Sequence, residues 1–183
     1  MNQSAPDLVL RPLTPADVPA LVLLNRASVP AVNDIDEREM AELVAWSTTA
    51  VGAVVPTHPD AVLGFVLALP PGLDYASENY RWFSERGADF SYVDRIVVAE
   101  GQRGSRVGER LYQAVFEGAR AAGATEVDCE VNVEPPNPGS LRFHGRLGFA
   151  EVGRQATKGG SVVVALLARP LEASDATAPA PLP

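Results

Sequence analysis

The chain has a single cysteine, Cys129, among its 183 residues. One thiol cannot form a disulfide within the chain, and a low cysteine content is typical of proteins from reducing compartments. We expect Cys129, on an apolar strand, to be a small core residue rather than a nucleophile. The two histidines, His58 and His144, lie far from it in sequence, so the sequence predicts no metal site.

Positive charge is also scarce. Fifteen Lys and Arg residues stand against 23 Asp and Glu residues, which gives a formal net charge of −8. Nucleic-acid binding requires a basic face, so we expect no nucleic-acid partner. An acidic chain is better suited to a cationic substrate.

Long apolar runs are missing. No stretch approaches the roughly 20 residues that a membrane-spanning helix needs, and residues 1–10 lack the charged and apolar regions of a signal peptide. We therefore expect a cytoplasmic protein with no membrane partner. The length predicts one domain, residues 1–172. An Ala- and Pro-rich tail, residues 173–183, is predicted to be disordered.

The order of the predicted elements indicates a mixed α+β fold. Strands are expected at Leu8–Arg11, Val51–Val55, Val62–Leu69, Phe90–Val98, Glu126–Val133, Ala150–Arg154 and Val162–Ala168. Helices are expected after Pro15 and at Glu37–Trp46, Ser105–Ala122 and Ser140–Arg146. Residues 70–84 are predicted to form a turn-rich segment with aromatic residues. The first half should be antiparallel, followed by a strand–helix–strand crossover between parallel strands.

The most informative segment joins the predicted strand Phe90–Val98 to the helix that follows it. It reads Gln-Arg-Gly-Ser-Arg-Val-Gly over residues 102–108. The free N–H groups of a first helical turn and the helix dipole favour an anion at such a turn. Gly104 and Gly108 allow close approach of a ligand to the backbone, and Arg103 and Arg106 add charge. The expected ligand group is a pyrophosphate. The segment lacks the Gly-Lys-(Ser/Thr) ending of a nucleotide phosphate loop.

A second group of motifs follows on the next strand and helix. It consists of Glu130-Val131-Asn132, Asn137-Pro138-Gly139-Ser140, and the run Phe-His-Gly-Arg-Leu-Gly-Phe over residues 143–149. Together with the Gly-rich turn, these residues resemble the GNAT superfamily of acetyl-CoA-dependent N-acetyltransferases. That superfamily has a (Gln/Arg)-x-x-Gly-x-(Gly/Ala) signature and a later Asn-x-x-(Ala/Ser)-x-x-(Phe/Leu)-Tyr-x-x-x-Gly-Phe signature. The resemblance covers residues 90–171.

The resemblance implies a central mixed, mostly antiparallel twisted sheet flanked by helices. It also implies an acyltransferase that moves acetyl from acetyl-CoA to a primary amine of a small molecule or peptide within a ternary complex. No metal is implied, and relatives are often homodimers. The residues that it assigns to acetyl-CoA binding are Ile96, Val97, Val98, Gln102, Arg103, Gly104, Ser105, Arg106, Val107, Gly108, Asn137, Ser140 and Phe143. A backbone N–H near Val97 or Val98 is similar to the family's oxyanion donor.

Two positions depart from the family pattern. Arg106 stands where many members carry glycine, and because non-glycine residues avoid positive φ we expect a negative φ there. His144 stands where the family places a tyrosine that acts as the general acid. A histidine could fill that role, and the alternative is a histidine that only orients a loop. We expect Tyr112, on the helix after the turn, to be a packing residue.

Acetyl transfer requires a base because an alkyl ammonium with a pKa near 10 is only ~0.1% neutral at pH 7. Asp94 is the first candidate and Glu130 the second. The structural alternative for Asp94 is an ion pair with Arg95 or Arg142, and Glu130 could simply face solvent.

The acceptor amine is not identified by the sequence. Tyr75, Tyr80 and Asn25 are the candidates for substrate binding, although aromatic residues under a long loop often just cover the core. The alternative function is a non-catalytic acyl-CoA-binding sensor or scaffold, which the tyrosine-to-histidine departure keeps open.

Overall fold

The computed structural model describes residues 8–172. Its strands are β1 (Val9–Pro12), β2 (Thr49–Val55), β3 (His58–Leu69), β4 (Phe90–Val98), β5 (Glu126–Glu134), β6 (Ala150–Thr157) and β7 (Val162–Pro170). Its helices are α1 (Val18–Arg26), α2 (Glu37–Trp46), α3 (Glu78–Arg86), α4 (Val107–Ala121) and α5 (Pro138–Arg146), with short 3₁₀ helices η1 (Pro15–Asp17), η2 (Glu100–Gln102) and η3 (Lys158–Gly160). The predicted tail, residues 173–183, lies outside the described residues.

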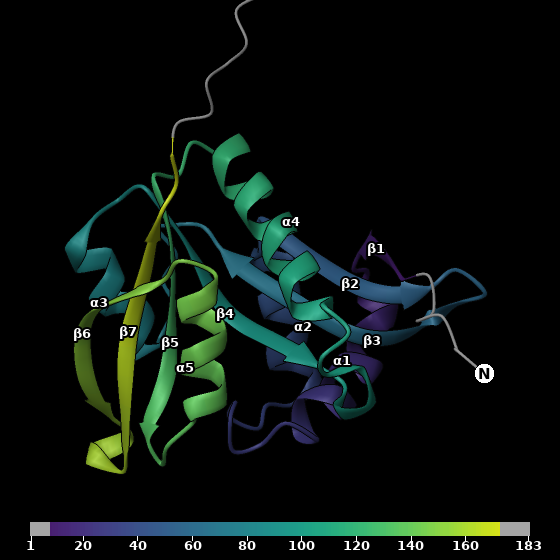
Figure 1. Cartoon of the computed structure of the whole chain (residues 1–183), viewed down its shortest axis with the longest axis horizontal. Helices are drawn as coiled ribbons and strands as arrows, with labels where there is room; N and C mark the ends of the chain where they lie inside the picture. Colours follow the sequence, from purple (N-terminus) through teal and green to yellow (C-terminus); the bar gives the residue numbers. More distant parts are fainter. Residues whose placement is uncertain (1–7, 173–183) are drawn as a thin grey trace, which may run out of the picture.

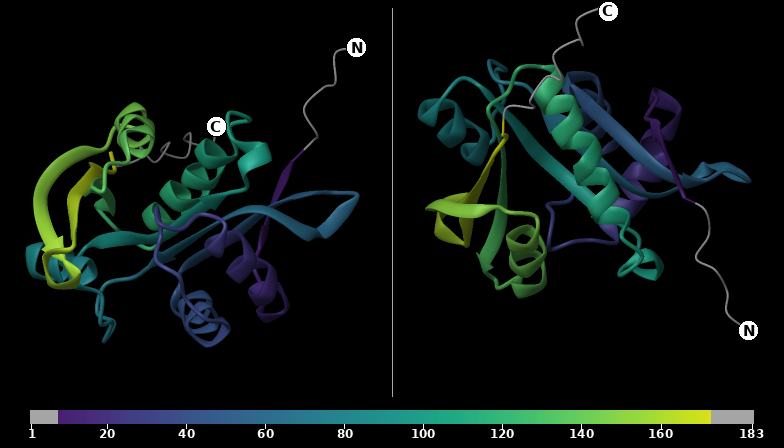
Figure 2. Two further views of the ribbon diagram at one scale, coloured as in Figure 1. Left: turned by 90° about the horizontal axis from the view of Figure 1, so that it is seen from below. Right: turned by 45° about the horizontal axis from the view of Figure 1, so that its top comes forward.

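The strands form one sheet in the order β1-β2-β3-β4-β5-β7-β6. Neighbouring strands are antiparallel except β4 and β5, which are parallel and are joined through α4. This arrangement confirms the predicted α+β class, with an antiparallel first half followed by a crossover. Helices α4 and α5 lie on one face of the sheet, and α1 and α2 lie on the other (Figures 1 and 2).

Each face of the sheet has its own hydrophobic core. On the α4 face, Val107, Leu111, Val115 and Ala119 are buried at helical spacing, and their contact surface includes Val93 of β4. Burial of each larger apolar side chain contributes about 1.5–3 kcal/mol. These contacts hold α4 against the sheet, so the position of its N-terminus relative to β4 is fixed.

Two local predictions were wrong. Residues 70–84 are not only a turn segment, because α3 begins within them: the Ser77 hydroxyl caps it by accepting a hydrogen bond from the backbone N–H of Tyr80. Tyr80 and Phe83 form its buried face. The second wrong prediction is the strand start at Val62, because β3 already begins at His58 and only Pro56 and Thr57 separate it from β2. Pairing of His58 with Val55 of β2 extends β3 against the local propensity of the residues at its start.

The strands β4 and β5 separate soon after they meet. Their register comprises three pairs, Phe90 with Glu126, Ser91 with Val127, and Tyr92 with Asp128. Beyond Tyr92 and Asp128 both strands continue, to Val98 and Glu134, without further pairing to each other among the described residues. The centre of the sheet therefore opens into a wedge with a strand edge on each side.

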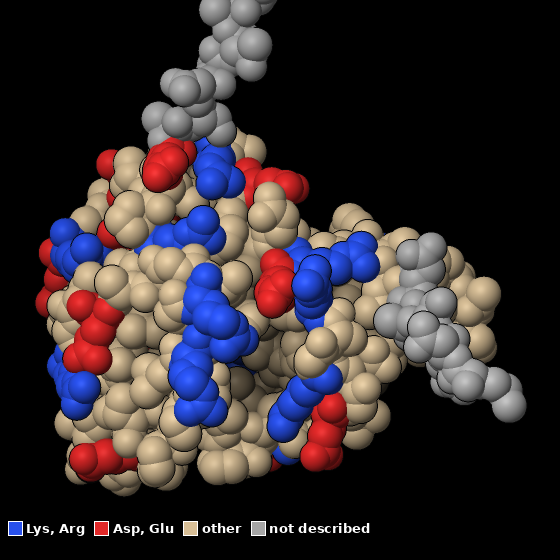
Figure 3. Space-filling view, in the orientation of Figure 1, with Lys and Arg blue, Asp and Glu red and all other residues tan. Residues whose placement is uncertain are grey.

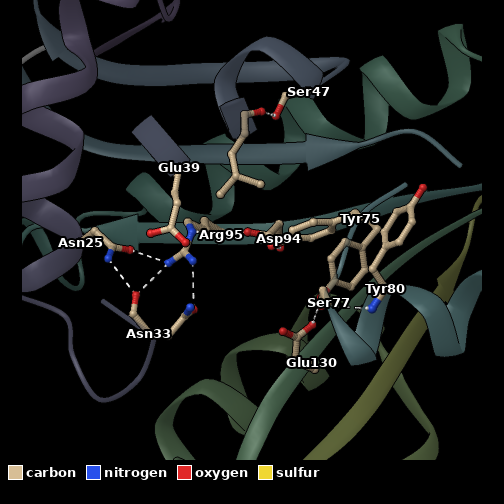
Figure 4. A network of polar contacts seen from close by, with 12 residues as sticks. Asn25, Asn33, Glu39, Ser47, Tyr75, Ser77, Tyr80, Asp94, Arg95 and Glu130 are labelled. Carbon is tan, nitrogen blue, oxygen red and sulfur yellow. Dashed lines mark hydrogen bonds and ion pairs between the residues drawn. The ribbon is translucent and has the colours of Figure 1, made fainter. Parts of the chain in front are cut away.

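A β-bulge lies on β4 at the start of this wedge. Leu67 of β3 is paired with Arg95 and the next residue, Ala68, with Val93, so Asp94 is an inserted residue. Because side chains alternate between faces along a strand, one inserted residue allows two successive side chains to face the same way. Asp94 and Arg95 accordingly both point toward the α1 and α3 side (Figure 4).

Candidate active site

A cavity of about 1230 Å³ occupies the wedge between β4 and β5. Its walls come from β4, β5, the turn before α4, α4 and α5, the connection between α1 and α2, and the η3 hairpin. Among its lining residues are Val93, Asp94, Ile96, Val97 and Val98 of β4 and Cys129, Glu130 and Asn132 of β5. The cavity therefore brings together two motif groups that are separate in the sequence.

One end of the cavity has the free N–H groups of a helix start. Within the described residues, the backbone N–H groups of Gly104, Val107 and Gly108 have no backbone acceptor, as expected for the first turn of a helix. They lie at the positive end of the α4 dipole. A Cβ atom on Gly108 would lie 2.9 Å from Cζ of the Phe143 ring, so a larger residue there would require the ring to shift.

The prediction for Arg106 was wrong. Its φ is +63° and its ψ is 13°, which is left-handed backbone at the N-cap of α4. The chain passes from extended backbone at Arg103 to a helix at Val107, and the left-handed residues Gly104 and Arg106 make that reversal. The left-handed conformation of a non-glycine residue costs roughly 1–2 kcal/mol. That cost buys a helix start directed at the cavity.

Arginines border the mouth of the cavity although the chain as a whole is acidic. Arg103 and Arg106 lie on the turn, and Arg146 lies on α5 across the opening. Basic side chains line both sides of a hollow between α5 and the start of α4 in the space-filling view (Figure 3). This end of the cavity is therefore complementary to an anionic ligand.

Two carboxylates lie deeper in the cavity, each with a tyrosine. The Tyr75 hydroxyl donates to Asp94 Oδ1 at 2.8 Å, and the Tyr92 hydroxyl donates to Glu130 Oε2 at 2.7 Å. Burial raises the pKa of Asp94, with Arg95 opposing the shift. Burial also raises the pKa of Glu130 to about 7, against the hydrogen bond from Tyr92. A carboxylate near pKa 7 in a cavity is suited to accept a proton at neutral pH.

The guanidinium of Arg95 is buried, with 3% exposure, and is held in a polar network (Figure 4). It donates to Asn25 Oδ1 at 2.7 Å and to Asn33 Oδ1 at 2.9 Å. Its Nε lies 3.3 Å from Asp94 Oδ2 in an ion pair, but not in hydrogen-bonding geometry. The network ties the connection between α1 and α2, which lines the cavity at residues 28–34, to the bulge of β4.

His144 faces Tyr112 rather than open space. Its Nε2 lies 2.7 Å from the Tyr112 hydroxyl, and its Nδ1 lies 2.8 Å from the backbone oxygen of Ser140. Burial lowers the pKa of His144 and raises the pKa of Tyr112 well above its usual range. Both residues lie beside the cavity, and Tyr112 is fully buried in the hydrophobic core on the α4 face, as the packing prediction for it expected.

The remaining candidates divide between the cavity wall and its support. All the residues that the resemblance assigned to acetyl-CoA binding line the cavity except Ser105, whose hydroxyl donates to the backbone oxygen of Gln102. The three substrate candidates do not line it. Tyr80 is 1% exposed and donates to the backbone oxygen of Pro70, Asn25 supports Arg95, and Tyr75 supports Asp94.

Asn79 and Lys158 are among the polar residues on the cavity wall that sequence reasoning missed. Asn79 lies on α3, a helix that the sequence reading treated as a turn segment. Lys158 is in the η3 hairpin, and its backbone N–H donates to Glu78 of α3 at 3.1 Å. The cap at Ser77 was the signal that could have placed Asn79 on a helix.

Comparison with known proteins identifies the family. The model of the acetyltransferase (GNAT) family matches residues 22–149, and the chain belongs to this family. Among solved structures, NAA60 from Arabidopsis thaliana in complex with a bisubstrate analogue is 20% identical, covers 91% of this chain and 99% of its own, and has a TM-score of 0.72.

Two further solved structures have the same fold. Ard1 from Thermoplasma volcanium is 17% identical, with 90% of this chain and 97% of its own covered and a TM-score of 0.71. The ribosomal-protein-S18-alanine N-acetyltransferase from Escherichia coli is 14% identical, with 93% and 97% covered and a TM-score of 0.69. No curated protein sequence matches the chain. Among residues 8–172, no helix is both long and apolar enough to cross a membrane.

Proposed function

We propose that this protein transfers an acetyl group from acetyl-CoA to a primary amine by direct attack within a ternary complex. The observation that carries the proposal is the shared cavity. It has an anion-binding helix start at one end and, deeper between the strands, a carboxylate with a pKa near 7. GNAT family membership supports an acyl-CoA substrate.

The residues present suit acetyl-CoA. The free N–H groups of the α4 start, with Arg103 and Arg106, would hold the pyrophosphate. The separated strands would receive the extended pantetheine arm, because the edge of β4 beyond Tyr92 is not paired with β5. A backbone N–H near Val97 or Val98 would stabilise the negative charge that develops on the thioester oxygen.

Glu130 is the base that the geometry favours. It lines the cavity, and burial without a cationic partner brings its pKa to about 7. It would take a proton from the ammonium form of the acceptor and so produce the nucleophilic amine. Asp94 lies across the wedge and is paired with Arg95, so we assign it to orientation of the site. The cavity wall suits a cationic acceptor because Asp34, Asp94 and Glu130 all line it.

The acceptor that we propose is a class of compound, a primary amine. NAA60 was solved with a bisubstrate analogue, and the Escherichia coli neighbour is named for an alanine of ribosomal protein S18. These neighbours support the inclusion of peptide α-amines beside small polyamines and amino-acid derivatives in any test panel.

The test is calorimetric titration with acetyl-CoA, followed by measurement of CoA-thiol release across that panel. We expect micromolar binding and release that depends on one class of amine. The double variant Arg103→Glu with Arg106→Glu should weaken acetyl-CoA binding at least about tenfold, because two attractive charges at the pyrophosphate become repulsive. The exposed Arg38→Glu on α2 is the matched control. Acetyl-CoA binding that the double variant leaves unchanged would contradict the site, and binding without release for any amine would favour an acyl-CoA sensor.

A further inference from the structure

Lys158 carries an inference about the acceptor of the acetyl group. It lies in the η3 hairpin between β6 and β7, is exposed, and lines the cavity. Among the described residues, Lys158 forms no ion pair. A cation in a cavity wall without a counter-charge of its own attracts an anionic group of a ligand.

Lys158 lies away from the cofactor end of the cavity. The basic residues that border the cofactor end, Arg103, Arg106 and Arg146, belong to the turn before α4 and to α5. Lys158 is instead next to α3, because its backbone N–H donates to the Glu78 carboxylate at 3.1 Å. Its charge is therefore placed to contact the acceptor rather than the pyrophosphate.

The hairpin that carries Lys158 is connected through α3 to the proposed base. Asn79 of α3 accepts a hydrogen bond from Gln155 Nε2 of β6 at 3.1 Å. Burial raises the pKa of Glu130, and hydrogen bonds from Tyr92 and Asn79 oppose the rise. Asn79 therefore contacts both the base and the strand that leads into the hairpin. It follows that Glu130 and Lys158 border the same part of the cavity.

The backbone of the hairpin does not itself require a lysine. The φ angles of Lys158, Gly159 and Gly160 are +52°, +66° and +89°. Left-handed backbone is unfavourable for a residue with a Cβ atom, and glycine adopts it without that strain. The turn alone therefore does not account for a lysine at this position.

The strand register limits the separation between the base and the hairpin. Glu130 is paired with Leu166 of β7, and the hairpin begins beyond the pair of Thr157 with Val162. Val162 precedes Leu166 by four positions, which corresponds to about 13 Å at ~3.3 Å per residue. The flexible lysine side chain shortens the gap. The amine and carboxylate of a free α-amino acid share one carbon atom and are too close together, whereas about two to four extended peptide residues fit.

We propose that the acceptor is the α-amine of a peptide with Asp or Glu among its second to fourth residues, and that Lys158 binds that carboxylate. The inference rests on the proposed acetyl transfer. The ammonium end of the peptide lies at Glu130 and loses its proton there, and the chain then extends to Lys158. Asp34, another carboxylate of the cavity wall, is paired with Arg26 at 3.2 Å. A polyamine would bring a second cation against Lys158 and is disfavoured.

The test compares peptide acceptors that differ in one charge. In C-terminally amidated tetrapeptides, Glu or Gln is placed at position 2, 3 or 4 in turn. For the wild type, kcat/KM should be about fivefold higher for Glu than for Gln at the best position, and 0.5 M NaCl should reduce this ratio.

Variants of the hairpin then assign the preference. Lys158→Met should remove the preference for Glu, Lys158→Glu should reverse it, and Lys158→Arg should keep it. All three keep a Cβ atom on the left-handed backbone, so Tm should stay within a few degrees of wild type. The Kd for acetyl-CoA should stay within about threefold. Arg154→Gln, at an exposed position on β6, is the matched control for loss of a positive charge.

Each outcome decides the proposal. Equal kcat/KM for Glu and Gln peptides at all three positions, in a wild type that acetylates both, would overturn the inference and leave the proposed function standing. A preference for Glu that persists in Lys158→Met would show that another residue binds the carboxylate. A higher kcat/KM for free glutamate or spermidine than for every acidic peptide would overturn the peptide assignment. A wild type that binds acetyl-CoA but acetylates no amine would contradict the proposed function and the inference together.

Discussion

The two strands that border the cavity hold their carboxylates in different ways. On β4, Asp94 receives a hydrogen bond from Tyr75 and lies 3.3 Å from the Arg95 guanidinium. On β5, Glu130 has a tyrosine but no cation of comparable proximity among its described contacts. A buried carboxylate that is paired with a fixed cation can serve as a structural ion pair. A buried carboxylate without such a cation has a raised pKa, close to the value that general base catalysis needs at neutral pH.

Asp128, on β5 next to Cys129, extends the contrast. Its side chain is fully buried, and neither of its oxygens has a hydrogen-bond partner among the described residues. Burial raises its pKa to about 8. Asp128 does not line the cavity, whereas Glu130, two residues later, does. Burial therefore produces a neutral structural acid at Asp128 and an accessible base at Glu130.

The strongest test of the contrast is Glu130→Gln. The amide keeps an oxygen for the Tyr92 hydroxyl but cannot accept the amine proton, so kcat should fall about 100-fold with the Kd for acetyl-CoA nearly unchanged. Because the carboxylate must be ionised, wild-type kcat/KM should rise about tenfold per pH unit up to pH 7 and then level off. A variant with the same kcat and the same pH limb would show that Glu130 is not the base.

Asp94→Asn should affect stability more than chemistry. It leaves the buried Arg95 without its counter-charge, although Asn25 and Asn33 still accept from it. We expect a loss of about 2 kcal/mol in the free energy of unfolding, measured by urea denaturation. If Asp94→Asn instead kept its stability and lowered kcat about 100-fold, Asp94 would be the base and Glu130 the orienting residue.

Asp128→Asn should change how stability depends on pH. The folded state holds the Asp128 proton up to a pKa of about 8, whereas an unfolded aspartate has a pKa of about 3.9. Stability from this group is therefore present at low pH and is lost as pH rises toward 8, by roughly 1 kcal/mol per pH unit. Urea unfolding between pH 5 and pH 8 measures this dependence. The free energy of unfolding of the wild type should fall with this slope as pH rises, and that of the variant should not. Parallel slopes for both proteins would contradict the buried neutral acid.

Asn33→Ala is the mildest change. It removes one acceptor of Arg95 from the connection between α1 and α2, while the ion pair of Arg95 with Asp94 remains. We expect KM for the amine to rise about threefold, because the loosened segment lines the cavity, with the Kd for acetyl-CoA unchanged. Steady-state kinetics with both substrates measures this change. A rise only in KM for acetyl-CoA would show that the segment contacts the cofactor and not the amine.

Much of the fold could be predicted because local pattern and tertiary contacts agree. The boundaries of α2 and β4 match the sequence prediction, since acidic capping at Asp36 and a strongly β-branched run specify them locally. The helix α3 was missed because Pro and Gly before it suggested turns throughout, although Ser77 is an ordinary helix cap. Strand separation after Tyr92 has no local signal, because pairing is a property of two distant segments.

The site was predictable in its motifs but not in its contacts. The Gly-rich turn predicted an anion-binding end, Asp94 and then Glu130 were the predicted bases, and the resemblance pointed to His144 as the acid. Neither the bulge that turns Asp94 and Arg95 to one side nor the pairing of Tyr112 with His144 can be read from spacing, because each depends on how separate elements pack. Tyr80 and Asn25 show the converse: both were predicted to bind the substrate, but neither lines the cavity, and each supports other residues through a hydrogen bond.

The wedge between β4 and β5 divides the sheet into two groups of strands, β1-β2-β3-β4 and β5-β7-β6. The two groups are joined at one end by three residue pairs between β4 and β5. Exposed strand edges usually invite other chains to add to a sheet. Here the two unpaired edges border the cavity, where an extended ligand could form hydrogen bonds with either of them. A ligand that bridges β4 and β5 would hold the two parts of the sheet together, so that ligand binding would also make the sheet more rigid.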